Sequence, residues 1–172
     1  MSVELQSALL IPVPDAEPLV GELRASLDPS AVAGVPAHVS LLYPFAPPDA
    51  IAEATLDDLR TMFGASTAFR FSLTNTAWFG DEVLYLTPEP AAPFVWMTER
   101  LAARFPDHLP YGGVFDQLVP HLTVAMQGTS EVEDRLQVGL PIAAVADEVH
   151  LMVEGDDGRW SVRERFPLGV RA

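Results

Sequence analysis

The chain lacks two reactive side chains altogether. None of its 172 residues is a cysteine, which excludes disulfide bridges, thiol nucleophiles and thiolate metal sites. None is a lysine, because all ten basic residues are arginines. This second absence excludes Schiff-base chemistry and the phosphate-binding lysine of a P-loop.

Positive charge is also scarce. Ten arginines stand against 24 acidic residues, which gives a formal net charge of −14. A surface this acidic repels long polyanions and offers no basic stripe for following a nucleic-acid backbone. One or two local arginines in a cleft can still hold a small phosphorylated ligand. We therefore expect a small nucleotide or a short RNA end as the partner, and no long nucleic acid.

Long hydrophobic runs are absent as well. No apolar stretch is long enough to span a bilayer, and the first residues lack the basic region of a signal peptide. Apolar residues nevertheless make up 49% of the chain, which is enough to build a core. We expect residues 1–172 to form a single domain of two intertwined lobes, which acts as a monomer in the cytoplasm and does not bind membranes.

What the sequence does contain is one short pattern, written twice. His38-Val39-Ser40-Leu41 and His121-Leu122-Thr123-Val124 both read histidine, apolar, hydroxyl, apolar. Because side chains in a strand alternate between faces, each histidine shares a face with the hydroxyl two residues later. The apolar residues then point toward a core. The sequence thus predicts two places where an imidazole and a hydroxyl lie together on a polar face.

The remaining elements follow from periodicity and turn signals. Asp15 is the predicted N-cap of the first helix, and Ser130 with Glu133 forms a predicted capping box for the last. Helices are predicted at 16–28, 49–63 and 93–105 and after Ser130. Strands are predicted at 8–13, 37–42, 69–77, 83–86, the second motif, 145–153 and 160–166, with Gly80-Asp81 turning a hairpin and a polar loop over 106–117.

This order places a motif strand in each half of the chain, with the two motif histidines 83 residues apart. Helices and hairpins alternate around both motif strands. The arrangement indicates an α+β fold of two similar lobes that face each other.

The two motifs, taken with Tyr43-Pro44-Phe45 after the first and Pro120 before the second, resemble the paired motifs of the two-histidine (2H) phosphoesterase superfamily. Within it, the chain is most similar to the 2′-5′ RNA ligase and cyclic phosphodiesterase-like branch. The resemblance implies a bilobal pseudo-symmetric fold in which two antiparallel sheets face a central cleft with helices outside. It also implies metal-free chemistry, without a cofactor, on 2′,3′-cyclic phosphates or related phosphodiesters.

The chemistry of these residues agrees with that expectation. Opening a cyclic phosphodiester requires in-line attack of water on phosphorus, with one proton taken and another given. Imidazole suits both roles because its ordinary pKa of about 6.5 keeps both forms populated near neutrality. We predict that His38 and His121 are the catalytic acid–base pair. We predict that Ser40 and Thr123 bind the phosphate through its non-bridging oxygens.

The roles of several other residues are open to more than one interpretation. Tyr43 and Phe45 could stack on a base at the mouth of the cleft or pack in the core. His108 and His150 lack the hydroxyl two residues later, and we expect them to be structural. Two histidines without a third ligand make a poor zinc site, so no metal is expected. Tyr85 and Trp78 are expected in the core or in hairpin pairs, Glu154–Asp157 in a solvated turn, and the arginines at 159, 163 and 165 on an exposed sheet face.

Three classes of function remain open at this stage. The favoured one is a phosphodiesterase for a small cyclic phosphate or a 2′-5′ phosphodiester. The second is a ligase or nuclease that processes the ends of structured RNA, which predicts a basic rim. The third is a non-catalytic nucleotide-binding module on the same fold.

Overall fold

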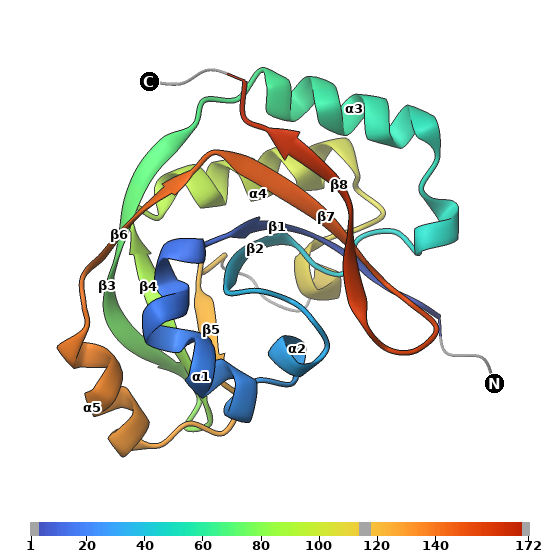
Figure 1. The fold of residues 1–172 in the computed structure, drawn as a ribbon. Helices are drawn as coiled ribbons and strands as arrows, with labels where there is room; N and C mark the ends of the chain where they lie inside the picture. The colour runs from blue at the N-terminus through green and yellow to red at the C-terminus, as the bar shows by residue number, and fades with distance from the viewer. Residues whose placement is uncertain (1–3, 114–117, 170–172) are drawn as a thin grey trace.

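Strands from distant parts of the chain build two antiparallel sheets (Figure 1). A computed structural model describes residues 4–113 and 118–169. The first sheet has the order β2 (His38–Leu42), β1 (Ser7–Pro12), β7 (Glu148–Glu154) and β8 (Trp160–Pro167). The second has the order β5 (Leu122–Ala125), β4 (Val83–Glu89), β3 (Phe69–Phe79) and β6 (Ile142–Ala146). The α+β fold with two antiparallel sheets is confirmed.

Helices fill the connections and pack on the sheets. α1 (Glu17–Leu27) contacts β5, α4 (Ala92–Arg104) contacts β2, α3 (Glu53–Gly64) contacts β8, and α5 (Ser130–Val138) contacts β3. α2 (Pro29–Val32) is a single turn, and η1 (Pro14–Ala16), η2 (Pro48–Ala50) and η3 (Pro110–Gly113) are 3₁₀ turns. The helices expected at 16–28, 49–63 and 93–105 are therefore present, although the second begins at Glu53 after the 3₁₀ turn η2.

One hydrophobic core joins the two sheets. Leu9 and Ile11 from β1, Leu84 and Leu86 from β4, and Leu59 from α3 are all 0% exposed and belong to the same buried cluster. Full burial of a leucine stabilises the fold by about 1.5–3 kcal/mol. The two halves of the chain are thus held by a shared interior, which fixes the motif strands relative to each other.

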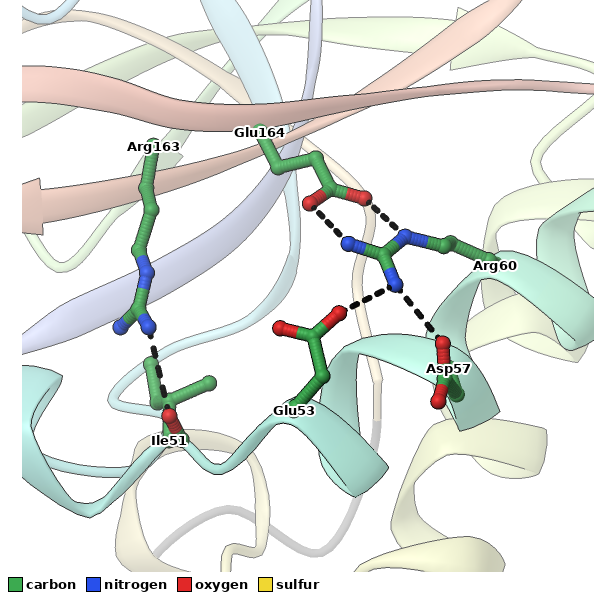
Figure 2. Close-up of polar contacts among 6 residues, drawn as sticks. All are labelled: Ile51, Glu53, Asp57, Arg60, Arg163 and Glu164. Atoms are coloured by element: carbon green, nitrogen blue, oxygen red, sulfur yellow. Dashed lines mark hydrogen bonds and ion pairs between the residues drawn. The ribbon is translucent and has the colours of Figure 1, made fainter.

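Arginine contacts attach α3 to the outer strand of the first sheet (Figure 2). The guanidinium of Arg60 donates to both carboxylate oxygens of Glu164 on β8 at 2.7 Å, and also contacts Glu53 and Asp57. Arg163 donates to the backbone carbonyl of Ile51 at 3.3 Å and to that of Pro48 at 2.8 Å. Arg60 thus links α3 to β8, and Arg163 links β8 to η2 and the residue that follows it.

The prediction of a single strand over 145–153 is wrong. It is interrupted at Asp147, where the chain leaves β6 in the second sheet and enters β7 in the first. Val145 pairs with Arg70 on β3, whereas Val149 pairs with Phe166 on β8. Apolar residues continue on both sides of the break, so periodicity alone does not reveal the change of sheet.

Both predicted helix caps are also wrong. Asp15 lies inside η1, and α1 begins after Ala16 without a side-chain cap. α5 is capped one residue earlier than expected, by Thr129, whose hydroxyl accepts from the backbone N–H of Val132 at 3.3 Å. Glu133 instead accepts from Trp78 Nε1 at 2.9 Å and from the hydroxyl of Thr76. A tertiary contact has replaced the local capping interaction.

Other parts of the chain also differ from expectation. β4 continues through Pro88 to Glu89, beyond the predicted end at Leu86. Pro88 pairs with Leu73 next to an irregularity in the β3–β4 ladder, where the missing N–H of proline is tolerated. The polar loop predicted over 106–117 contains η3, and its residues 114–117 lie outside the described residues.

Candidate active site

The two motifs come from neighbouring edge strands of different sheets. His38 is the first residue of β2, and His121 immediately precedes β5. β2 and β5 contact each other, and the charge on His121 is close enough to lower the pKa of His38. The tertiary structure therefore brings together the two histidines that are 83 residues apart in the sequence.

The faces of both motifs are as alternation predicts. Val39 and Val124 are 0% exposed and lie in the core. His38 and Ser40 in one motif, and His121 and Thr123 in the other, are half-buried. Each imidazole thus shares the accessible face of its strand with a hydroxyl.

Both imidazoles are held in the same way by the backbone just before them. His38 Nδ1 lies 2.7 Å from the carbonyl oxygen of Pro36, and His121 Nδ1 lies 2.7 Å from that of Val119. A carbonyl only accepts, so Nδ1 carries the proton and donates in both rings. In the neutral imidazole this tautomer leaves the Nε2 lone pair to accept a proton.

The backbone that holds His38 is itself anchored by α1. The guanidinium of Arg24 donates to the carbonyl of Val35 at 3.1 Å, next to Pro36. Glu17 accepts from the backbone N–H of Ala37 at 2.7 Å. Arg24 is only 2% exposed and pairs with Asp28 at 3.3 Å. The residues on either side of Pro36 are thus fixed by charged side chains of one helix.

These surroundings shift the pKa of His38 strongly. Burial lowers the pKa to about 4, and the carbonyl of Pro36 opposes that shift by accepting a hydrogen bond from the ring. The charge of Arg24 lowers the pKa further, Asp28 raises it, and His121 lowers it. His38 is therefore neutral at pH 7, the form in which it can act as a base.

His121 lies against two aromatic rings. Its ring is perpendicular to Phe79 at 4.8 Å between centroids, and edge-on to Tyr85 at 5.5 Å. Tyr85 is the direct cross-strand partner of Thr123. Burial lowers the pKa of His121, against the effect of the Val119 carbonyl. The second histidine is thus supported by rings, and its carbonyl partner belongs to a residue that is 43% exposed.

The two aromatic candidates after the first motif have different positions. Phe45 is 4% exposed and packs edge-on against Phe105 and His108, so its burial favours the core reading over contact with a base. Tyr43 is half-buried and its hydroxyl donates to Gln6 at 2.6 Å. Burial and the nearby charge of Glu154 raise the pKa of Tyr43. Of the two residues, only Tyr43 presents surface to a ligand.

The other polar residues that drew attention have contacts elsewhere. His150 is buried and its Nε2 lies 2.7 Å from Glu148. Arg159 donates to the carbonyl of Val32. Within 4–113 and 118–169 no group of three His, Asp or Glu side chains is arranged to hold a metal ion. Among the same residues, no helix is both long and apolar enough to cross a membrane.

One hollow on the surface is lined by neither histidine. Its volume is about 420 Å³, and it is located between η1 and the β3–β6 pair. The lining residues are Asp15, Arg70, Phe71, Ser72, Glu89 and Ala143–Val145. The candidate site is therefore defined by the histidine pair and not by this hollow.

Three residues near His38 and His121 were not predicted from the sequence to belong to the site. Arg24 has one signal in the sequence, because Asp28 follows it at the spacing of a helical ion pair. Tyr85 was expected in the core or in a hairpin pair, and Phe79 was given no role; no local signal connects either ring with His121. Their role depends on the pairing of β4 with β5.

Known proteins resemble this chain in sequence. The family model of the 2′-5′ RNA ligase superfamily matches residues 12–158. A protein of Bacillus cereus strain G9842 named "Putative phosphoesterase" is 29% identical over 160 residues, covering 86% of this chain and 87% of that protein. A protein of the same name from Bacillus thuringiensis strain Al Hakam is 28% identical, with the same coverage of both chains.

Solved structures share the fold. TT0787 of Thermus thermophilus superimposes with a TM-score of 0.64 at 20% identity, covering 96% of this chain and 98% of that one. Escherichia coli LigT in its apo form gives a TM-score of 0.60 at 17% identity, with the same coverage. From the family match and this shared fold, the chain belongs to the 2′-5′ RNA ligase superfamily, within the two-histidine phosphoesterases.

Proposed function

We propose that the protein is a metal-independent phosphodiesterase that hydrolyses a small 2′,3′-cyclic phosphate or a 2′-5′ phosphodiester. His38 and His121 act as the general acid–base pair, and Ser40 and Thr123 bind the phosphate oxygens. The observation that carries the proposal is the duplicated geometry. On two contacting edge strands, an imidazole with Nδ1 fixed by a backbone carbonyl lies next to a hydroxyl on the same face.

The proton transfers follow from that geometry. The Nε2 of one neutral imidazole accepts a proton from water as the water oxygen bonds to phosphorus. The other imidazole, protonated, gives its proton to the ribose oxygen as the phosphorus–oxygen bond of the ring breaks. A phosphate anion between the rings raises the pKa of a neighbouring imidazole and so favours the protonated acid. The roles exchange in the reverse reaction.

The hydroxyls of Ser40 and Thr123 are positioned to stabilise the negative charge of the phosphate. Ser40 and Thr123 each lie two residues after a histidine and on its side of the strand. Hydrogen bonds from such donors to the non-bridging oxygens are worth most when they are aimed at charge that develops during the reaction. We therefore assign the two hydroxyls to the phosphate group.

The charge of the protein supports a small substrate. Arg24 is paired with Asp28, Arg60 contacts Glu164, and Arg163 donates to the backbone carbonyl of Ile51. With a net charge of −14, the protein is poorly suited to long RNA. The relatives named as phosphoesterases support the reaction class. Escherichia coli LigT, which has this fold, was solved in complex with 3′-AMP, a mononucleotide.

Hydrolysis of nucleoside 2′,3′-cyclic monophosphates in the presence of EDTA tests the proposal. We expect turnover by the wild type, a bell-shaped pH profile, and a loss of at least about a hundredfold in His38→Ala and in His121→Ala. His108→Ala is the matched control, because it removes a half-buried imidazole that packs against Phe45, outside the pair.

The alternatives make different predictions. Loss of wild-type activity on adding EDTA contradicts the metal-independent mechanism. Turnover of structured RNA ends, but not of mononucleotides, favours the ligase or nuclease. A non-catalytic binding module shows no turnover, and its His38→Ala variant keeps most of the affinity of the wild type for a nucleotide.

A further inference from the structure

Phe79 ends β3 beside the candidate site. It pairs with Val83 across the hairpin, and the turn that follows is opened by Gly80 with a φ of 63°. Phe79 is 37% exposed, whereas Tyr85, the ring it packs on, is 7% exposed. An exposed phenylalanine next to a candidate catalytic histidine is a surface that a flat ligand could cover.

The arrangement of the three rings leaves one face of Phe79 uncovered by the other two. Phe79 and Tyr85 are stacked, with centroids 4.2 Å apart and planes inclined by 25°. His121 is perpendicular to Phe79 at 4.8 Å and still only 5.5 Å from Tyr85. The imidazole is near both rings, so it lies at the side of the stack and not on the outer face of Phe79. A planar group on that outer face would continue the stack next to His121.

We propose that the outer face of Phe79 binds the nucleobase of the substrate. The inference rests on the proposed function, and it specifies the substrate as a nucleoside cyclic phosphate or a nucleoside 2′-5′ diester. Stacking of a base on an aromatic ring requires no hydrogen-bond readout, so the site accepts different bases. Purines have the larger stacking area, and they bind more tightly than pyrimidines.

The β4–β5 ladder relates the proposed base site on Phe79 to the hydroxyl of Thr123. Tyr85 is opposite Thr123 in the β4–β5 ladder, and Phe79 stacks on Tyr85. A base on the outer face of Phe79 therefore lies beyond the ring of Tyr85, the strand partner of Thr123. The ribose of a nucleotide bridges these two positions, with its cyclic phosphate at His121.

Substitution of Phe79 tests the proposal with two cyclic phosphates, one with a base and one without. The substrates are adenosine 2′,3′-cyclic monophosphate and glycerol 1,2-cyclic phosphate. Phe79→Leu keeps an apolar side chain without a flat face, and Phe79→Trp keeps the flat face. We expect Phe79→Leu to lower the ratio of kcat/KM for adenosine over glycerol substrate about tenfold, mainly through KM. Phe79→Trp keeps the ratio within about threefold of the wild type.

Trp96→Leu is the matched control, because Trp96 is an exposed aromatic residue on α4 whose ring contacts Arg100. It should leave the ratio unchanged. An equal loss on both substrates in Phe79→Leu contradicts base binding and assigns Phe79 to the support of His121. An unchanged ratio contradicts the proposal as well.

Equilibrium binding separates this proposal from the proposed function. Calorimetric titration of wild type and Phe79→Leu with adenosine 3′-monophosphate needs no turnover. About tenfold weaker binding by the variant supports the base site even where no cyclic phosphate is hydrolysed. Equal binding by the two proteins overturns the base site and leaves the acid–base pair untouched.

Discussion

The two motif segments have the same local structure in different surroundings. Each histidine donates from Nδ1 to the carbonyl two residues earlier at 2.7 Å. Around His38, the charged side chains of Arg24 and Glu17 anchor that backbone, and the pKa falls to about 4. Around His121, the support is aromatic, from Phe79 and Tyr85. A repeated motif thus fixes the orientation of both rings, while the packing around each ring sets its electrostatics.

The largest effect should come from removing both histidines at once. If the two rings transfer protons in one concerted step, neither works alone. We expect the His38→Ala/His121→Ala double variant to lose about as much kcat as the worse single variant, to within about tenfold. Measurement of kcat on one cyclic phosphate checks this. If the loss of kcat in the double variant instead equals the product of the two single losses, the two segments act independently.

The substitution Arg24→Met removes the charged side chain that holds the backbone next to His38. This change leaves Asp28 buried without its cation, which costs about 3 kcal/mol of the free energy of unfolding. It also removes a charge that lowers the pKa of His38, so the acid limb of the kcat/KM profile moves to higher pH. Urea denaturation and pH–rate profiles measure the two effects.

Arg135→Met provides the control, because Arg135 is exposed on α5 and makes no ion pair with the described residues. Asp28→Asn removes a charge that raises the pKa of His38, and it should move the acid limb to lower pH. Shifts of the same sign in Arg24→Met and Asp28→Asn would show that the ion pair acts through structure and not through its charges.

The hydroxyls of the two motifs should be equivalent although their surroundings differ. We expect Ser40→Ala and Thr123→Ala each to lower kcat about tenfold to a hundredfold, because each removes one donor to the phosphate. Ser40→Thr and Thr123→Ser keep a hydroxyl and should stay within a few-fold of the wild type. A loss confined to one motif would mean that a single segment binds the phosphate.

The smallest effect concerns stability and pH. Burial gives His38 a pKa of about 4 in the folded state, below its ordinary 6.5. The unfolded chain therefore takes up a proton first as the pH falls, and the protein loses stability between about pH 6.5 and pH 4. We expect this loss to be about 2 kcal/mol, allowing for partial solvent screening.

Thermal unfolding across that pH range measures the loss. His38→Asn should flatten the pH dependence, and His121→Asn should also flatten it, because burial lowers the pKa of His121 as well. Equal slopes in the wild type and His38→Asn would contradict the assigned environment of His38.

Much of the fold, and the faces on which the candidate site residues lie, could be predicted from the sequence. The face of each motif follows from alternation, because Val39 and Val124 had to be buried if β2 and β5 were strands. The β3–β4 hairpin followed from the turn at Gly80-Asp81. The change of sheet at Asp147 did not, because alternation is the same on both sides of it and only strand pairing distinguishes them.

The sequence by itself determined the candidate residues of the site: two imidazoles, each with a hydroxyl two positions later, beside apolar residues that enter a core. Backbone geometry fixes that relation locally, since successive side chains alternate whatever the neighbours are. Only the tertiary structure decided that the two motifs meet, that Arg24 anchors one of them, and that Phe79 and Tyr85 lie against the other. Those relations depend on contacts between residues far apart in the chain, which no local period encodes.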